Sequence, residues 1–202
     1  MDDYYNNPIE LPERTAGASI VVLLLSVVSG MLSTGYQWWS LRGTRGDLGE
    51  PRSIFDVFQS FFKVLMLTLI KSLLFTIGVL LFVVPGIFLA LIYSQAEYIM
   101  FENPNAGAID CMRRSRQLMG GHLGEYFVLI LSFLGWEILA VFAASIISAV
   151  AFMSGLSMVT TMLVVLFIAQ LWLTPYMQFT YAGYYNYLTN YKPEEPVQEV
   201  TE

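Results

Sequence analysis

Residues 138–191 read ILAVFAASIISAVAFMSGLSMVTTMLVVLFIAQLWLTPYMQFTYAGYYNYLTNY, and these 54 residues contain no charged side chain. A single helix of that length would extend about 80 Å, whereas the hydrocarbon core of a bilayer is about 30 Å thick. The run therefore has to turn, and Ser154-Gly155 is the natural place for the turn. It predicts two membrane-spanning helices, near residues 125–153 and 157–187.

The rest of the chain has the same character. Of its 202 residues, 56% are hydrophobic and 13% are charged, compared with about 25% charged residues in an ordinary soluble domain. Charge-free runs over residues 16–41 and 72–96 anchor three further spans, which we place near residues 17–39, 62–84 and 86–102. The predicted fold class is all-α: a polytopic transmembrane helix bundle of about five spans within residues 16–191.

The net charge of −6 is located at the two ends of the chain, because residues 1–15 and residues 192–202 each carry −3. We interpret these ends as an acidic amino-terminal segment and an acidic tail that is disordered on its own. The body between them is neutral, which argues against a nucleic-acid partner. The single cysteine, Cys111, excludes a fold held together by disulfides within the chain.

Pro85-Gly86 permits two topologies, a turn between two spans or a kink inside one long helix. A turn places both arginine clusters on one side of the membrane, as the positive-inside tendency prefers. These clusters are Arg42, Arg45 and Arg52, and Arg113, Arg114 and Arg116. We therefore expect the turn, with an external amino terminus and a cytoplasmic carboxyl terminus; a re-entrant pair of short helices is the alternative.

Two features are expected at the membrane surface. Asn103-Pro104 and Gly120-Gly121 delimit a cytoplasmic amphipathic helix, whose basic surface of Arg113, Arg114 and Arg116 is either a solvated face or a contact for anionic lipid headgroups. Ser53 and Asp56 indicate the start of a helix that leads into the second span. Aromatic belts are expected at Trp38 and Trp39, and at Tyr181, Tyr184, Tyr185 and Tyr187.

Ionisable and amide side chains inside spans are costly and therefore mark a candidate intramembrane polar site. Its members are Lys71, Glu97, Glu137 and Gln170. Lys71 and Glu137 have similar estimated depths of about 15 Å, so we expect an ion pair that either locks two helices together or serves a polar solute. Pro175 is expected to bend the fifth span.

Small residues recur every four positions in two spans and predict faces on which helices approach closely. They are Ser26, Gly30 and Thr34 in the first span, and Ala140, Ala144 and Ser148 in the fourth. These faces serve either contacts within the bundle or an interface with a second copy or a partner subunit.

Several stretches, in order, carry a resemblance to a known family. They are VPGI at 84–87, SRQLMGGH at 115–122, FVLILSFLGW at 127–136, and Pro175-Tyr176 followed by Ala182 and Tyr185. Together with residues 35–62, they resemble the bacterial integral-membrane family catalogued as domain-of-unknown-function family 975, over residues 30–188. The resemblance implies a multi-pass protein of the bacterial cytoplasmic (inner) membrane and no established chemistry.

Signatures of enzymes are weak. The chain has one histidine, His122, in a basic loop, so we expect no catalytic residues, no metal site and no cofactor. Two functions remain. The first is an accessory or scaffold subunit that binds another membrane protein or itself, and the second is a small transporter or lipid-handling protein with a polar intramembrane site. Membrane lipids are the expected partners in both cases.

Overall fold

The computed structural model describes residues 16–47 and 49–191, and every regular element in these residues is helical. The elements are α1 (Ala16–Thr44), the 3-10 helix η1 (Pro51–Ser60), α2 (Phe61–Leu81), α3 (Val83–Ile92), α4 (Ala96–Glu102), α5 (Ala108–Leu118), α6 (Leu123–Met153) and α7 (Met158–Leu188). The predicted all-α class is confirmed. The acidic ends, residues 1–15 and 192–202, lie outside the described residues.

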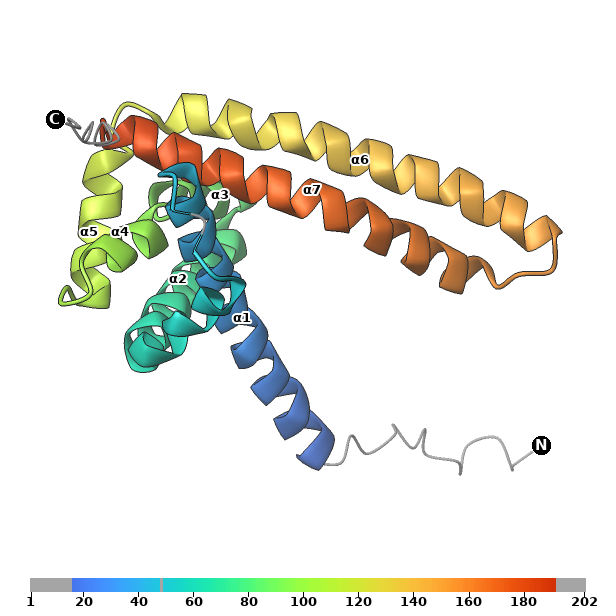
Figure 1. Cartoon of the computed structure of the whole chain (residues 1–202), viewed down its shortest axis with the longest axis horizontal. Coiled ribbons are helices and arrows are strands. Elements are labelled where there is room, and N and C mark those ends of the chain that lie inside the picture. Colours follow the sequence, from blue (N-terminus) through green and yellow to red (C-terminus); the bar gives the residue numbers. More distant parts are fainter. Residues whose placement is uncertain (1–15, 48, 192–202) are drawn as a thin grey trace, which may run out of the picture.

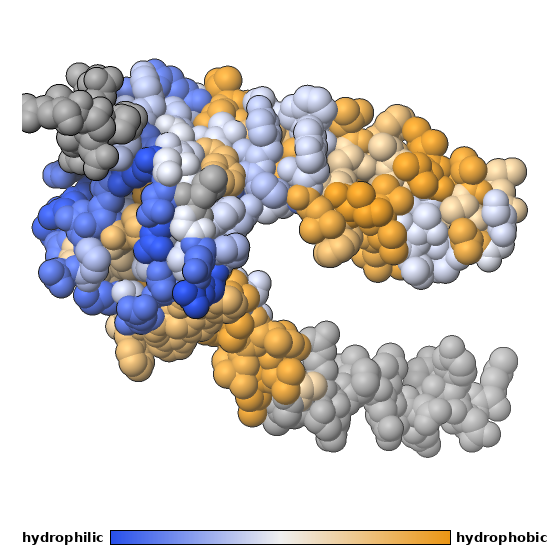
Figure 2. All heavy atoms as spheres, in the orientation of Figure 1, coloured by the Kyte–Doolittle hydropathy of each residue, from blue (hydrophilic) through white to orange (hydrophobic). Residues whose placement is uncertain are grey.

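Five helical stretches are long and apolar enough to cross a membrane. They are Ala18–Thr44, Pro51–Leu81, Val83–Glu102, Leu123–Met153 and Met158–Leu188. Figure 1 shows that α1 and the α6–α7 hairpin diverge from a common base, which also contains α4 and α5. In Figure 2 the base is largely hydrophilic, whereas the diverging arms are mostly apolar and a wide notch separates them. Polar residues are thus concentrated at one end of the molecule, and apolar residues toward the tips of the arms (Figure 2).

The long hairpin turns where the charge-free run predicts it. α6 ends at Met153 and α7 begins at Met158. Gly155 has a φ of +86°, a left-handed conformation that glycine adopts without a steric penalty. Ser157 then caps α7, because its side chain accepts a hydrogen bond from the backbone N–H of Thr160.

The second turn lies three residues before Pro85. Phe82 is extended, with φ −163° and ψ 148°, and separates α2 from α3. Pro85 belongs to the first turn of α3, where its missing N–H costs no helical hydrogen bond. The two helices touch at Gly78 and Gly86; a Cβ on Gly78 would lie 2.8 Å from the Gly86 Cα. Glycine is required on both helices for this approach.

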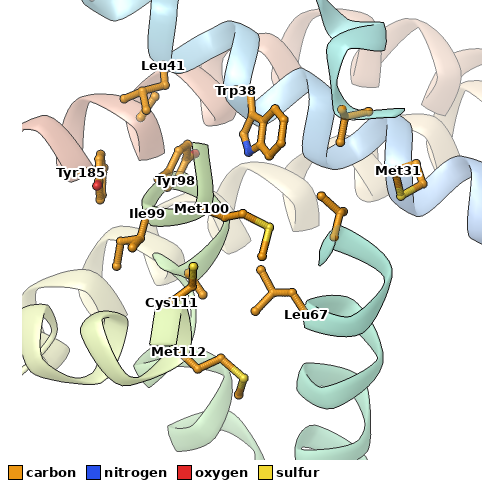
Figure 3. Packing of buried hydrophobic residues seen from close by; sticks show 14 residues of the cluster. Met31, Trp38, Leu41, Leu67, Tyr98, Ile99, Met100, Cys111, Met112 and Tyr185 are labelled. Atoms are coloured by element: carbon orange, nitrogen blue, oxygen red, sulfur yellow. The ribbon is translucent and has the colours of Figure 1, made fainter. Parts of the chain in front are cut away.

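The apolar composition predicted one continuous helix for the third span, but the structure divides this span into two helices. α3 ends at Ile92, a short turn follows, and α4 begins at Ala96. Five consecutive residues of α4, Ala96 to Met100, are buried. Neighbours on several sides of α4 account for this burial, as Figure 3 shows for Trp38, Leu67 and Cys111 from α1, α2 and α5.

Two aromatic residues expected in membrane-surface belts belong to the core instead. Trp38 is 7% exposed, and its Nε1 donates a hydrogen bond to the backbone carbonyl of Glu97 at 2.9 Å. Tyr185 is 1% exposed and stacks on Tyr98, with 5.2 Å between ring centroids. The belt prediction is therefore wrong for Trp38 and Tyr185, because the base packs around them (Figure 3).

The two helices predicted at the membrane surface are present, as η1 leading into α2 and as α5, but the capping residues predicted for them are wrong. Glu50, not Ser53, precedes η1, and the Ser53 hydroxyl makes no cap. Asp56 instead pairs with Arg42 at 3.2 Å. Asn103 ends α4 by donating from its side chain to the carbonyl of Ile99, and Gly107 precedes α5. Asp56 and Asn103 thus bond to a tertiary partner and to the preceding helix, whereas the Ser53 hydroxyl has no partner among the described residues.

The two small-residue faces have different surroundings. Ala144 and Ser148 are fully buried on α6, whose main neighbour is α7. On α1, Thr34 is buried but Ser26 is exposed, and a Cβ on Gly30 would meet nothing within 4 Å. The α6 face is a contact within the bundle, whereas the first half of the α1 face is uncovered by the described residues.

Candidate functional site

A cavity of about 430 Å³ lies where the base meets the membrane-spanning helices. Residues from α1, α2, α3, α4, α6 and α7 line it. They are Gln37, Thr68, Lys71, Ser72, Phe75, Leu89, Ala90, Tyr93, Ser94, Glu97, Tyr98, Tyr126, Gln178 and Tyr181. This volume is in the range of small-molecule sites.

Lys71 and Glu97 form an ion pair in the wall of this cavity. The Lys71 Nζ lies 2.5 Å from Glu97 Oε1, and the side chains are 22% and 10% exposed. The expected Lys71–Glu137 pair is therefore wrong. The physical reason is the tight α2–α3 turn at Phe82, which folds the chain back so that α4 presents Glu97 to the middle of α2.

Glu97 is held in place through its backbone as well as its carboxylate. Its carbonyl accepts the hydrogen bond from the Trp38 indole, which ties α4 to α1. The other carboxylate oxygen, Oε2, is buried and has no hydrogen-bond partner among the described residues. Gln178 Oε1, on α7, is likewise buried and unpartnered. Two buried acceptors in one cavity wall thus require donors that the described residues do not supply.

Tyrosine rings form much of the remaining wall. Tyr126 from α6 lies against Tyr181 and Tyr184 from α7, with ring centroids 5.9 Å and 5.2 Å away. Tyr98, on α4, also lines the cavity. These rings combine an apolar body with a polar hydroxyl, which suits a cavity that contains both charges and hydrocarbon.

The other two members of the predicted polar site form a separate cluster between α6 and α7. Gln170 Nε2 donates to Glu137 Oε2 at 2.8 Å, and Thr174 Oγ1 donates to Gln170 Oε1 at 3.0 Å. No basic side chain among the described residues pairs with Glu137. Gln170 therefore bridges the two helices, but it does not line the Lys71–Glu97 cavity. Pro175 follows Thr174 within the continuous helix α7.

The predicted basic surface lies on α5. Arg113, Arg114 and Arg116 are exposed, and Arg113 pairs with Asp110 at 3.5 Å. On the opposite side of α5, Cys111 is fully buried, and burial raises the pKa of its thiol. Contact of the arginines with anionic lipid stays a prediction. Within residues 16–47 and 49–191, there is no group of three or more side chains that could hold a metal ion.

Sequence reasoning missed Gln178 and the tyrosines of the cavity wall. Gln178 has the same type and the same helix as Gln170 and lies eight residues further along. A second amide side chain about two helical turns after the first indicates a polar stripe on this apolar helix, and this pattern is present in the sequence. The sequence assigned Tyr181 to a surface belt, because amphipathic rings near the end of a span fit a belt equally well, and it gave no role to Tyr93, Tyr98 or Tyr126.

Comparison with known proteins identifies one family. The family model described as "Protein of unknown function (DUF975)" matches residues 19–192. No curated protein and no solved structure matches the chain.

Proposed function

The chain belongs to the DUF975 family, a family of unknown function, and we propose its role from the cavity. We propose that it binds a polar solute or a lipid headgroup within the membrane, as a small transporter or lipid-handling protein. The observation that carries this proposal is Glu97, which lines a cavity of about 430 Å³ and whose buried Oε2 has no donor among the described residues. A purely structural ion pair would gain by satisfying that oxygen within the protein.

The position of the cavity supports access from the membrane. Lys71 lies about 15 Å along α2 from its first residue, well inside a helix that is apolar enough to cross a bilayer. Ser72 and Phe75 line the cavity and are also exposed, so the cavity is open on the α2 side. An amphiphile could reach it from the lipid.

The proposed setting is the bacterial cytoplasmic membrane, with the carboxyl terminus in the cytoplasm. The contacts of Arg45 support the ends of α1, α4 and α7 lying on the same side of the membrane. Arg45 pairs with Glu102 at the end of α4 and donates to Asn186 Oδ1 near the end of α7 at 2.9 Å. Arg42 lies near the end of α1, and three further arginines lie on α5, which belongs to the same base (Figure 1). The positive-inside tendency therefore favours a cytoplasmic base.

The test is purification in nanodiscs from the native membrane, followed by native mass spectrometry of the bound molecules. Ser72→Phe places a ring in the cavity, and Ser132→Phe makes the same change at an exposed α6 position that does not line it. We expect a bound molecule in the wild type and Ser132→Phe, and its loss in Ser72→Phe. An identical set of bound molecules in all three proteins would contradict the proposal.

A second candidate function is the accessory or scaffold subunit, and the uncovered part of the α1 face favours it. Small residues let transmembrane helices approach closely, and Gly30 has open space beside it. Gly30→Leu should reduce the mass of the purified assembly, whereas Gly135→Leu should not, although Gly135 also has open space around it. An unchanged assembly in Gly30→Leu would remove the support for this function.

A further inference from the structure

The charges of the cavity restrict what it can bind, and this argument rests on the proposed function. Its lining contains one ammonium group, on Lys71, and one carboxylate, on Glu97. The two already pair through Glu97 Oε1. A ligand with a single charge would leave one of these groups poorly matched in a site of low dielectric. A ligand that carries both signs preserves the balance.

The unpartnered oxygens determine where the positive end of such a ligand would lie. Glu97 Oε2 and Gln178 Oε1 come from different helices, α4 and α7, and both are buried acceptors. Only a donor can satisfy them. An ammonium group with N–H bonds supplies donors to both and meets the carboxylate with a charge-assisted hydrogen bond.

Lys71 is available for the negative end. Its ammonium group has three N–H donors, and the described residues use one of them, toward Glu97. The side chain is 22% exposed and lines the cavity. An anionic group of the ligand can therefore accept from Lys71 without breaking the ion pair.

The aromatic wall also suits a cation. Tyr93, Tyr98, Tyr126 and Tyr181 line the cavity, and an ammonium group over a tyrosine ring is attracted by the ring quadrupole. This attraction applies to a primary ammonium and to a trimethylammonium alike. Only the two unpartnered oxygens distinguish between them, because a trimethylammonium has no N–H.

We propose that the cavity binds a primary alkylammonium group tethered to an anionic group, with the ammonium at Glu97 and Gln178 and the anion at Lys71. This is the chemistry of a phosphoethanolamine headgroup. The source is either a membrane lipid, which would reach the cavity through its open α2 side, or a water-soluble zwitterion.

The experiment uses the full chain in nanodiscs and two probe lipids with identical acyl chains, phosphatidylethanolamine and phosphatidylcholine. Native mass spectrometry measures how much of each lipid the protein retains. We expect about a tenfold preference for phosphatidylethanolamine, the factor that a hydrogen bond to a charged group carries. Soluble glycerophosphoethanolamine, a phosphodiester with one charge of each sign, is added in a separate series. Displacement of the lipid identifies the aqueous zwitterion as a competent ligand, and retention identifies the lipid.

Two glutamine substitutions on α7 provide the matched comparison. Gln178→Leu removes the neutral acceptor of the cavity and leaves Glu97 in place, so it should reduce the preference about threefold. Gln170→Leu removes the same side chain outside the cavity and should leave the preference unchanged. The wild-type comparison does not depend on the folding of either variant.

The outcomes separate this inference from the proposed function. Equal retention of both lipids by the wild type, or a preference for phosphatidylcholine, would overturn the headgroup assignment. The cavity function would then still stand if Ser72→Phe removes the bound molecule. Absence of any bound lipid or glycerophosphoethanolamine, together with no effect of Ser72→Phe, would overturn both.

Discussion

Glu97 and Glu137 are glutamates in two of the five stretches that are long and apolar enough to cross a membrane, yet the structure gives them different environments. Glu97 pairs with a lysine at 2.5 Å, lines a cavity, and has one buried carboxylate oxygen without a partner among the described residues. Glu137 accepts a hydrogen bond from the Gln170 amide at 2.8 Å and has no basic partner among the described residues. The first carboxylate belongs to a site where charge must be balanced, and the second belongs to a helix–helix contact. The difference shows that a buried carboxylate acquires its role from its neighbours.

The largest effect should follow from breaking the Lys71–Glu97 pair on one side. Glu97→Leu leaves the Lys71 ammonium without its partner, which should destabilise the fold by about 3–5 kcal/mol. Lys71→Leu combined with Glu97→Leu should recover most of that stability, because no unpaired charge remains, but it should abolish ligand binding. A stable Glu97→Leu protein would contradict the proposed role of the pair.

Labelling of Cys111 measures the stability of these variants. Cys111 is the single cysteine of the chain, it is fully buried beside the base, and burial raises the pKa of its thiol. The thiol therefore stays protonated and unreactive in the folded protein at neutral pH, and gains reactivity when the base opens. The rate of maleimide labelling in increasing denaturant reports the stability of each variant relative to the wild type.

An intermediate effect should follow from removing the partner of Glu137. Gln170→Leu leaves the Glu137 carboxylate without its amide donor, at a cost of about 1–3 kcal/mol. Thermal unfolding in detergent, followed by circular dichroism, measures this loss. Binding in the Lys71–Glu97 cavity should be retained, because Gln170 does not line it. Loss of binding without loss of stability would mean that the two clusters act together.

The smallest effect should follow from Glu137→Gln. The replacement keeps the shape of the side chain and an oxygen that can accept from Gln170, and the contact has no ion pair to lose. We expect a change in stability below about 1 kcal/mol, the scale of an interhelical hydrogen bond in a membrane. The matched Glu97→Gln variant, unfolded in the same way, should lose more, since it removes the partner of a lysine. Equal losses in the two variants would remove the distinction drawn between the two glutamates.

The sequence alone determined the all-α class and the approximate positions of five apolar helices. The turn at Ser154-Gly155 could be predicted because a charge-free run of 54 residues is too long for one span. The rarity of polar residues in the spans also identified Lys71 and Glu97 as candidates. These inferences succeed because transfer of a segment into hydrocarbon depends on its local composition.

Only the tertiary structure decided which polar residues meet. The turn at Phe82 and the break between α3 and α4 set the height of Glu97 relative to Lys71, and depth counting along separate helices could not include them. The burial of Trp38 and the place of Gln178 in the cavity wall were fixed in the same way. Composition decides whether a helix enters the membrane, but the rotation and offset of packed helices decide which side chains share a site, and these depend on the contacts of the whole bundle.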